Sequence, residues 1–246
     1  MESFDKSAYV YGVFSRISDK YDVMNDLESL GLHRLWKAQL VRELSRQNPA
    51  SVLDIACGTG DIAIAVAQAL PAARVVGLDF NEPMLEVAKR RATREAPFGF
   101  VVGESGTRST NNLRLMTGDA MALPFDDESF DAASISFGLR NMPDYALSLA
   151  EIYRVLRPGG RLYCLEASYP TNELVKPPFK LYFKYWLPVL AKLVVNSPEE
   201  YAWLNTSTEA FPSKDELALL MQAIGFSEVS YSSFLLGAAA LHRSTK

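Results

Sequence analysis

Hydrophobic residues recur at helical spacing through residues 1–50. In the segment LHRLWKAQLVREL (32–44), the apolar side chains fall near one face of a helix: Leu32, Leu35, Trp36, Leu40, Val41 and Leu44. From residue 51 onward the pattern changes, and short apolar runs begin to alternate with helical segments. We therefore predict an N-terminal helical region over residues 1–50, followed by a unit built around a sheet.

The alternating segments predict strands separated by helices. Strands are expected over 51–56, 73–80, 112–120, 130–139 and 161–168, with helices over 61–70, 81–96 and 145–160. An Asn cap and a proline in the first turn mark the start of the helix at 81, and Pro-Gly-Gly marks the end of the helix at 160. Strands that alternate with helices in this way favour a mainly parallel sheet with helices on both faces.

Three further segments complete the predicted organisation. Residues 97–112 are rich in Gly, Ser, Thr and Asn, as in a surface loop, and a helix over 213–225 precedes a closing pair of strands over 227–244. Residues 170–212 interrupt the alternation and are rich in aromatic residues and proline, so we expect a helical cap over the carboxyl edge of the sheet. The α/β domain is thus predicted to comprise residues 51–169 and 213–246.

The composition of the chain favours a folded protein and disfavours several functional classes. Of 246 residues, 48% are hydrophobic and 22% charged, which suits a folded core. With 25 basic and 29 acidic residues and no basic run, a nucleic-acid surface is disfavoured. Cys57 and Cys164 lack the spacing of a zinc site or a disulfide framework, and neither a secretory signal nor a spanning run of about 18 apolar residues is visible. We expect a cytoplasmic protein without a metal.

A glycine turn follows the first strand, in DIACGTGDIA (54–63). Gly58 and Gly60 allow a tight turn and a close approach of the backbone to a ligand, although glycine pairs also occur in turns that bind nothing. Asp54 and Asp61 flank the turn and would repel the pyrophosphate of NAD. They suit the cationic groups of S-adenosylmethionine, while Asp61 as a simple helix cap remains the alternative.

Two more carboxylates come where strands end. Asp79 can accept both hydroxyls of a ribose, or it can cap the next helix. Asp119 can accept the amino group of an adenine, with Met84 and Met121 as neighbours of the ring or as core filler. Both carboxylates favour a nucleoside cofactor, but they do not distinguish NAD from S-adenosylmethionine.

The order of these motifs resembles a known family. VLDIACGTGD, GLDFNEPML, GDAMALPFDDESFDA and EIYRVLRPGGRLYCLEAS are typical of class I methyltransferases, and YDVMNDLESLGLHRLWK and SFGLRNMPD are more specific. Over residues 9–246 the chain resembles the C-methyltransferases of ubiquinone and menaquinone biosynthesis. The resemblance implies a Rossmann-like, seven-stranded, mainly parallel sheet with an antiparallel edge strand, and transfer of a methyl group from S-adenosylmethionine to a ring carbon of a reduced polyprenyl quinone.

The same resemblance suggests roles for individual residues. It implies cofactor contacts at Thr59, Asp79, Asp119, Ala120 and Ser136, beside Asp54, Gly58 and Gly60 of the glycine turn. Candidates for the acceptor side are Tyr21, Tyr201 and His33, although a single His on an N-terminal helix is more often structural. The lipid acceptor suggests contact with the inner face of a membrane, and the sequence leaves a homodimer open.

The pair Arg140-Asn141 at the end of the fourth strand is the best candidate for the chemistry. A phenol has a pKa near ~10, so the site must stabilise the phenolate that activates the ring carbon. The guanidinium of Arg140 stays protonated and can act by its charge, and Asn141 can hydrogen-bond the ring oxygen. In the alternative interpretation, Arg140 forms a salt bridge with Asp144 or Glu166. A class I methyltransferase with another small acceptor, an NAD-linked oxidoreductase and a nucleoside-binding module are the competing functions.

Overall fold

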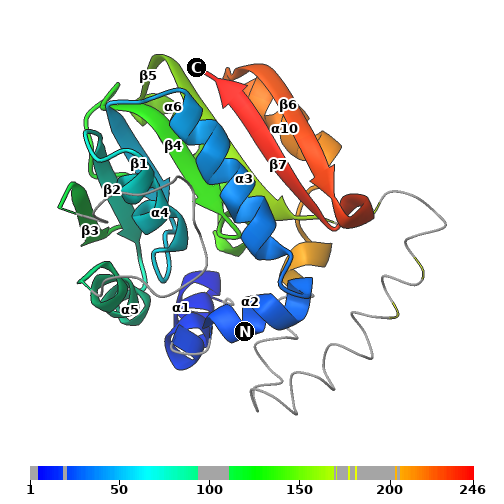
Figure 1. The fold of residues 1–246 in the computed structure, drawn as a ribbon. Coiled ribbons are helices and arrows are strands. Elements are labelled where there is room, and N and C mark those ends of the chain that lie inside the picture. The colour runs from blue at the N-terminus through cyan, green and yellow to red at the C-terminus, as the bar shows by residue number, and fades with distance from the viewer. Residues whose placement is uncertain are drawn as a thin grey trace.

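Seven strands form one sheet in the computed structural model, which describes residues 5–18, 21–93, 111–168, 170, 177, 181, 203 and 206–246. The strands lie in the order β3-β2-β1-β4-β5-β7-β6 (Figure 1). Their bounds are β1 (Ser51–Ile55), β2 (Arg74–Asp79), β3 (Leu113–Thr117), β4 (Phe130–Ser136), β5 (Leu156–Ala167), β6 (Ser227–Phe234) and β7 (Ala239–Thr245). The predicted fold class is confirmed.

The direction of the strands fixes where a ligand can bind. β1 pairs in parallel with β2 and β4, and β5 pairs in parallel with β4. β7 runs antiparallel to both β5 and β6, so the reversed strand lies one place inside the edge that β6 forms. The strand order turns back between β1 and β4, and open α/β sheets bind ligands at such a switch point, outside the carboxyl ends of the strands.

Helices cover both faces of the sheet. α3 (His33–Arg46) and α4 (Asp61–Ala69) pack on one face, and α6 (Tyr145–Val155) and α10 (Lys214–Ile224) pack on the other (Figure 1). α5 (Glu82–Thr93) packs against β2 and β3. α1 (Lys6–Ile17) and α2 (Tyr21–Ser29) lie at the carboxyl ends of the strands, so the predicted N-terminal helical region is present in the described residues.

Local signals explain most of the boundaries. The Asn81 side chain accepts a hydrogen bond from the amide of Met84 at 3.1 Å, and Ser213 forms a capping box with Glu216, as expected at helix starts. The predicted helix over 145–160 was too long, because α6 ends at Val155 and β5 begins at Leu156. Arg157 precedes a proline, which disfavours the helical conformation at that position.

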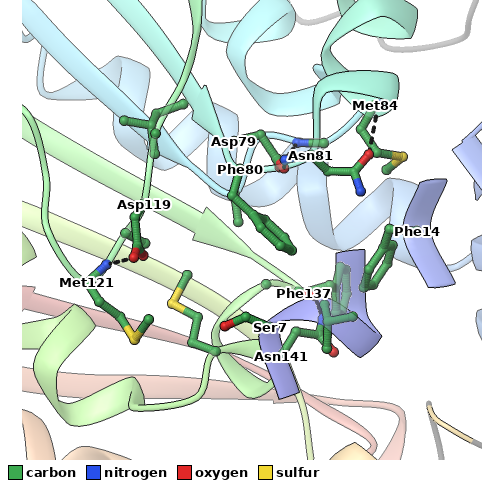
Figure 2. Close-up of a pocket in the computed structure, with 18 of the residues that line it drawn as sticks. Ser7, Phe14, Asp79, Phe80, Asn81, Met84, Asp119, Met121, Phe137 and Asn141 are labelled. Carbon is green, nitrogen blue, oxygen red and sulfur yellow. Dashed lines mark hydrogen bonds between the residues drawn. The ribbon is translucent and has the colours of Figure 1, made fainter. Parts of the chain in front are cut away.

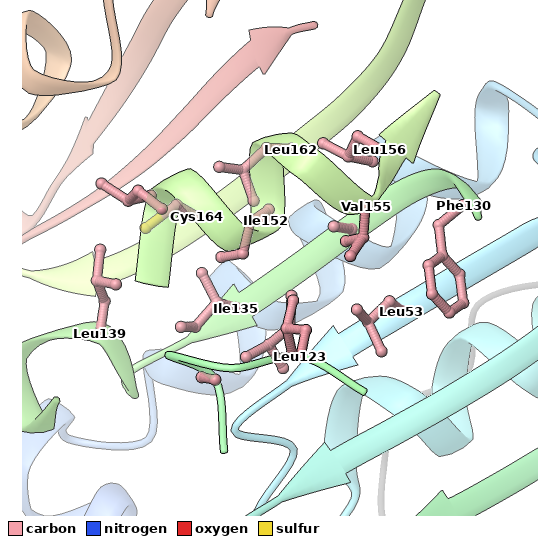
Figure 3. Packing of buried hydrophobic residues seen from close by; sticks show 14 of the residues in the cluster. Leu53, Leu123, Phe130, Ile135, Leu139, Ile152, Val155, Leu156, Leu162 and Cys164 are labelled. Carbon is pink, nitrogen blue, oxygen red and sulfur yellow. The ribbon is translucent and has the colours of Figure 1, made fainter. Parts of the chain in front are cut away.

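Two predicted segments lie mostly outside the described residues. The loop predicted at 97–112 and the cap predicted at 170–212 fall largely there, and the division into domains stays a prediction. Within the described part, the core between the sheet and α6 is fully buried; it includes Leu53, Ile135 and Ile152 (Figure 3). This packing holds the end of β4 in place, and β4 leads directly into the loop that carries Arg140 and Asn141.

Gly60 is needed for two separate reasons, which a pair of variants can distinguish. It has φ +86° at the start of α4, and an added Cβ would lie 3.0 Å from the Cβ of Ala88 on α5. Gly159 has φ +78°, but an added Cβ would meet nothing within 4 Å. We expect Gly60→Ala to lower the free energy of unfolding by about 2–5 kcal/mol, from left-handed strain plus overpacking.

Gly159→Ala carries the strain alone and is expected to cost about 1–2 kcal/mol. Urea denaturation of both variants beside the wild type measures the difference. Equal losses would show that the close packing of α4 on α5 does not depend on the missing side chain.

Candidate active site

A cavity of about 220 Å³ lies at the carboxyl ends of β1, β2 and β4. The turns after these strands form one wall, and α1 and α2 form another. Nine of the residues named in the sequence analysis line it together: Tyr21, Gly58, Asp79, Met84, Asp119, Ala120, Met121, Ser136 and Asn141. The parallel topology brings the strand ends to one place, as the ligand-binding rule for open sheets requires.

Asp79 joins two of the turns that form this wall. One carboxylate oxygen accepts the amide of Gly58 at 2.7 Å, and the other accepts the amide of Asn81 at 2.8 Å. Burial raises the pKa of Asp79 to about 6, although these backbone amides oppose the shift. Because Asn81 caps α5, the helix-cap interpretation of Asp79 does not hold. A carboxylate has about four lone-pair sites, so Asp79 keeps acceptor capacity for a ribose.

Ser136 and Asp119 extend the same wall. The hydroxyl of Ser136 is buried and has no hydrogen-bond partner among the residues that the structure describes. Buried polar atoms are normally satisfied, so this hydroxyl fits a polar group of a bound ligand. Asp119 accepts the amide of Met121 at 2.8 Å, and both residues face the cavity (Figure 2). The arrangement fits a nucleoside cofactor.

The carboxylates that flank the glycine turn have other partners. Asp54 is buried and accepts the hydroxyl of Ser134 at 2.7 Å, and burial raises its pKa to about 7. Asp61 pairs with Lys37 at 2.8 Å and Arg91 at 2.9 Å. Burial would raise the pKa of Asp61, but the Lys37 ammonium outweighs it and holds that pKa below its ordinary value. The charge argument for a cationic ligand therefore needs correction, because neither carboxylate faces the cavity as a free anion.

Thr59 and Gly60 also lie away from the cavity lining. The hydroxyl of Thr59 donates to Asp22 on α2 at 3.3 Å, and Asp22 in turn pairs with Arg91 on α5. Gly60 starts α4 and contacts α5, as described above. Thr59 links the glycine turn to α2, and Gly60 packs the turn against α5, so a cofactor contact at these two residues stays a prediction.

His33 lies in a separate polar cluster. Its Nε2 is 3.0 Å from Asp26, and the guanidinium of Arg34 contacts the same carboxylate. Burial lowers the pKa of His33 to about 4, so the imidazole is neutral near pH 7. The cavity lining does not include His33, and its geometry matches the structural interpretation.

The side chains of Arg140 and Asn141 lie in two different environments. Arg140 is buried and pairs with Glu166 on β5, which is one of the salt bridges left open by the sequence. Asn141 lines the cavity; its amide nitrogen donates to the carbonyl of Phe137 at 3.3 Å, and its oxygen accepts from Trp203 at 3.0 Å. Tyr201, the remaining acceptor candidate, lies outside the described residues.

Several cavity residues were not assigned from the sequence. Phe14, Phe80 and Phe137 point toward the same space in Figure 2. Phe80 and Phe137 each follow a strand-end residue that was assigned, and this adjacency was the signal that could have identified them. α1 contributes Ser7 and Val10 with Phe14, at the spacing of one helix face.

Hydrogen bonds from Lys6 and Asn81 hold α1 in this position. Lys6 donates to the carbonyls of Arg140 at 3.1 Å and Met142 at 2.5 Å. Asn81 donates to the carbonyl of Tyr11 and the hydroxyl of Ser15, both at 3.0 Å. α1 is thus attached to the turn after β2 and to the loop after β4.

Comparison with known proteins identifies the family. The model of the ubiE/COQ5 methyltransferase family matches residues 2–246. The chain belongs to this family. The predictions of a methyltransferase and of S-adenosylmethionine as its cofactor are confirmed, and this donor fits the nucleoside-type cavity described above.

Individual relatives and solved structures agree with the family. The chain is 43% identical over 242 residues to a demethylmenaquinone methyltransferase of Staphylococcus haemolyticus, covering 98% of this chain and 95% of the relative. A second such enzyme, from Staphylococcus carnosus, is 43% identical over 95% of this chain and 91% of its own. A methyltransferase structure from Thermotoga maritima, described as a possible histamine N-methyltransferase, has a TM-score of 0.62 and 21% identity over 96% of this chain and 99% of its own, which shows the fold.

None of the helices in the described part of the chain is long and apolar enough to cross a bilayer.

Because the carboxyl of Asp54 is buried, the free energy of unfolding is expected to depend on pH in the wild type more than in an Asp54→Asn variant. Its pKa is about 7 in the folded chain and ordinarily 3.8, so between these values the folded state binds a proton that the unfolded state has lost. Stability from this group therefore falls as pH rises from about 4 to about 7. We expect Asp54→Asn to gain stability relative to wild type across that window, by up to about 4 kcal/mol.

Urea denaturation of both proteins at several pH values measures this difference. His33 and Asp79 titrate in both proteins, so their contributions largely cancel in the comparison. A difference that stays constant with pH would show that Asp54 is ionised in the folded chain throughout the window.

Proposed function

We propose that this chain methylates a ring carbon of a reduced polyprenyl quinone, either a demethylmenaquinol or a polyprenyl-benzoquinol. The observation that carries the proposal is the 43% identity, over nearly the whole chain, to enzymes named demethylmenaquinone methyltransferase. The cavity supports it, because Asn141 lies in the same space as the strand-end residues that suit a nucleoside. The alternative is a class I methyltransferase with another small-molecule acceptor.

The residues at the ends of β2 and β4 form the cofactor half of the cavity. We assign the ribose hydroxyls to Asp79, a polar cofactor group to the hydroxyl of Ser136, and the adenine amino group to Asp119. Ala120, Met84 and Met121 line the same end and suit contact with the purine ring. When bound, S-adenosylmethionine supplies an electrophilic methyl group on a sulfonium, so the protein's work is alignment and exclusion of water.

Asn141 is the group that we assign to the acceptor. Its amide nitrogen carries two hydrogens, and the carbonyl of Phe137 takes one through a long bond. The second hydrogen can donate to the ring oxygen and stabilise the phenolate that makes the neighbouring carbon nucleophilic. Trp203 holds the other end of the amide, which fixes the direction of the donor. Val10 and Phe14 on α1 keep this end of the cavity apolar.

Cofactor affinity tests the role of Asp79. Asp79→Asn replaces one oxygen with an NH₂ group that faces the backbone amide of Gly58 or Asn81, and it weakens the ribose contact. We expect the Kd for adenosylhomocysteine to rise at least about tenfold, since hydrogen bonds to a charged group contribute about 1.5–3 kcal/mol each.

Asp119→Asn is the matched control for that measurement. The one oxygen that Asn keeps has two lone pairs, which can serve both the amide of Met121 and the adenine amino group, and we expect the Kd to change less than about threefold. Isothermal titration calorimetry of both variants decides the point. Similar losses in the two variants would show that Asp79 has no special role in holding the ribose.

The reaction itself is tested with purified protein. The chain is incubated with S-adenosylmethionine and either demethylmenaquinol or a benzoquinol with the same prenyl tail, under reducing conditions. We expect one quinol to gain a methyl group on a ring carbon with equimolar adenosylhomocysteine, measured by liquid chromatography and mass spectrometry. Asn141→Ala should bind adenosylhomocysteine normally and lose about 100-fold in turnover, as when one preorganised donor is removed.

Absence of methylation with both quinols, in protein that binds adenosylhomocysteine, would favour the alternative acceptor class. Peripheral contact with a membrane and a homodimer stay predictions. Vesicle flotation tests the first and analytical ultracentrifugation tests the second. Three exposed leucines support the membrane contact: Leu30 after α2, Leu35 in the first turn of α3 and Leu236 between β6 and β7.

A further inference from the structure

The loop that follows β4 forms the acceptor end of the cavity. Phe137, Gly138, Asn141, Met142 and Pro143 all line it. Within the loop, the amide of Asn141 donates to the carbonyl of Gly138, and the amide of Met142 donates to the carbonyl of Leu139, both at 3.1 Å. These short-range bonds shape a single 3-10 turn over Leu139–Asn141, but they do not by themselves fix its position on the sheet.

Glu166 makes the link between this loop and the sheet. It lies near the end of β5 with 2% of its surface exposed, and its carboxylate accepts three hydrogen bonds. The backbone amide of Arg140 donates at 3.2 Å, the Arg140 guanidinium pairs with the same carboxylate, and the amide of Ala167 donates at 2.8 Å. One side chain therefore holds both the main chain and the side chain of Arg140.

Arg140 also connects Glu166 to the rest of the loop. Its guanidinium also donates to the carbonyl of Phe137 at 3.1 Å, and the same carbonyl accepts the amide nitrogen of Asn141. Glu166, Arg140, Phe137 and Asn141 thus form a connected series that ends at the cavity. Arg140 and Glu166 do not line the cavity, whereas Phe137 and Asn141 do.

We propose that Glu166 is a positioning residue for methyl transfer, which acts through Arg140 to hold the side chain of Asn141 toward the acceptor. The proposal rests on the proposed function for its kinetic consequences. Burial of the Arg140 cation requires a partner, and the carboxylate of Glu166 supplies both the charge and the geometry. Replacement of the carboxylate by an amide of the same size weakens both contacts and leaves the volume unchanged.

A second Arg–Glu pair provides a matched control. Glu43 on α3 pairs with Arg243 on β7, with an Nη2–Oε1 distance of 2.7 Å. This pair joins α3 to the sheet, as the Arg140–Glu166 pair joins the loop after β4 to the sheet, but neither Glu43 nor Arg243 lines the cavity. Glu43→Gln therefore reports what the loss of such a pair does to the fold alone.

Hydrogen–deuterium exchange tests the proposal without any acceptor. In the complex with adenosylhomocysteine, we expect Glu166→Gln to speed exchange at least about tenfold in the peptide that contains residues 137–142, with β1 and β2 unaffected. Glu43→Gln should leave that peptide at the wild-type rate. Wild-type exchange of residues 137–142 in Glu166→Gln would overturn the proposal.

Kinetics then connect the loop to the reaction. We expect Glu166→Gln to raise KM for the quinol and lower kcat, each about tenfold, while the Kd for adenosylhomocysteine stays within about threefold of wild type. An equal loss of affinity for adenosylhomocysteine would indicate general loosening and overturn the proposal. Where Glu166→Gln fails to fold, Arg140→Lys keeps the charge but loses the planar fork, and the same measurements apply. A wild-type protein that methylates no quinol contradicts the proposed function, while the exchange result still decides the role of Glu166.

Discussion

The hydrogen bonds of Asp79 tie together the two turns on which the active site depends. One oxygen binds the glycine turn after β1, and the other binds the start of the turn before α5. The positions of Gly58, Asn81 and Met84 around the cavity follow from these two bonds. Because Asn81 also binds α1, the same carboxylate indirectly sets the place of the helix that closes the cavity. A residue first identified as a ribose acceptor is therefore also a structural part of its own site.

Much of the fold and part of the site followed from the sequence. The strand and helix order was predictable because apolar periodicity reports burial, and a parallel sheet places its strand ends at one edge. For that reason Asp79, Asp119 and Ser136 meet in one cavity although they are far apart in the chain. The predicted end of α6 at residue 160 was wrong, because the helix ends at Val155, ahead of the pre-proline residue Arg157 and not at the glycines beyond it.

The rest of the site depends on partners that local sequence does not show. Asp61 looked like a free anion beside the turn, but Lys37 and Arg91 from two other helices neutralise it. Arg140 stands beside Asn141 in the sequence, yet only Asn141 lines the cavity, since Glu166 on the neighbouring strand pairs with the guanidinium of Arg140. The choice between the alternatives left open for Arg140 required the register of β4 and β5, which periodicity alone does not give.

The attachment of α1 has a consequence for how this family can diversify. Three of the hydrogen bonds that attach it end on main-chain carbonyls, those of Arg140, Met142 and Tyr11. Every amino acid offers a carbonyl, so substitutions at these positions leave the acceptors of those bonds in place. The side chains of α1 that face the cavity can therefore vary to accommodate differently shaped head groups while the helix remains docked. Selection for a new acceptor could change these side chains without changing the carbonyl acceptors that hold α1.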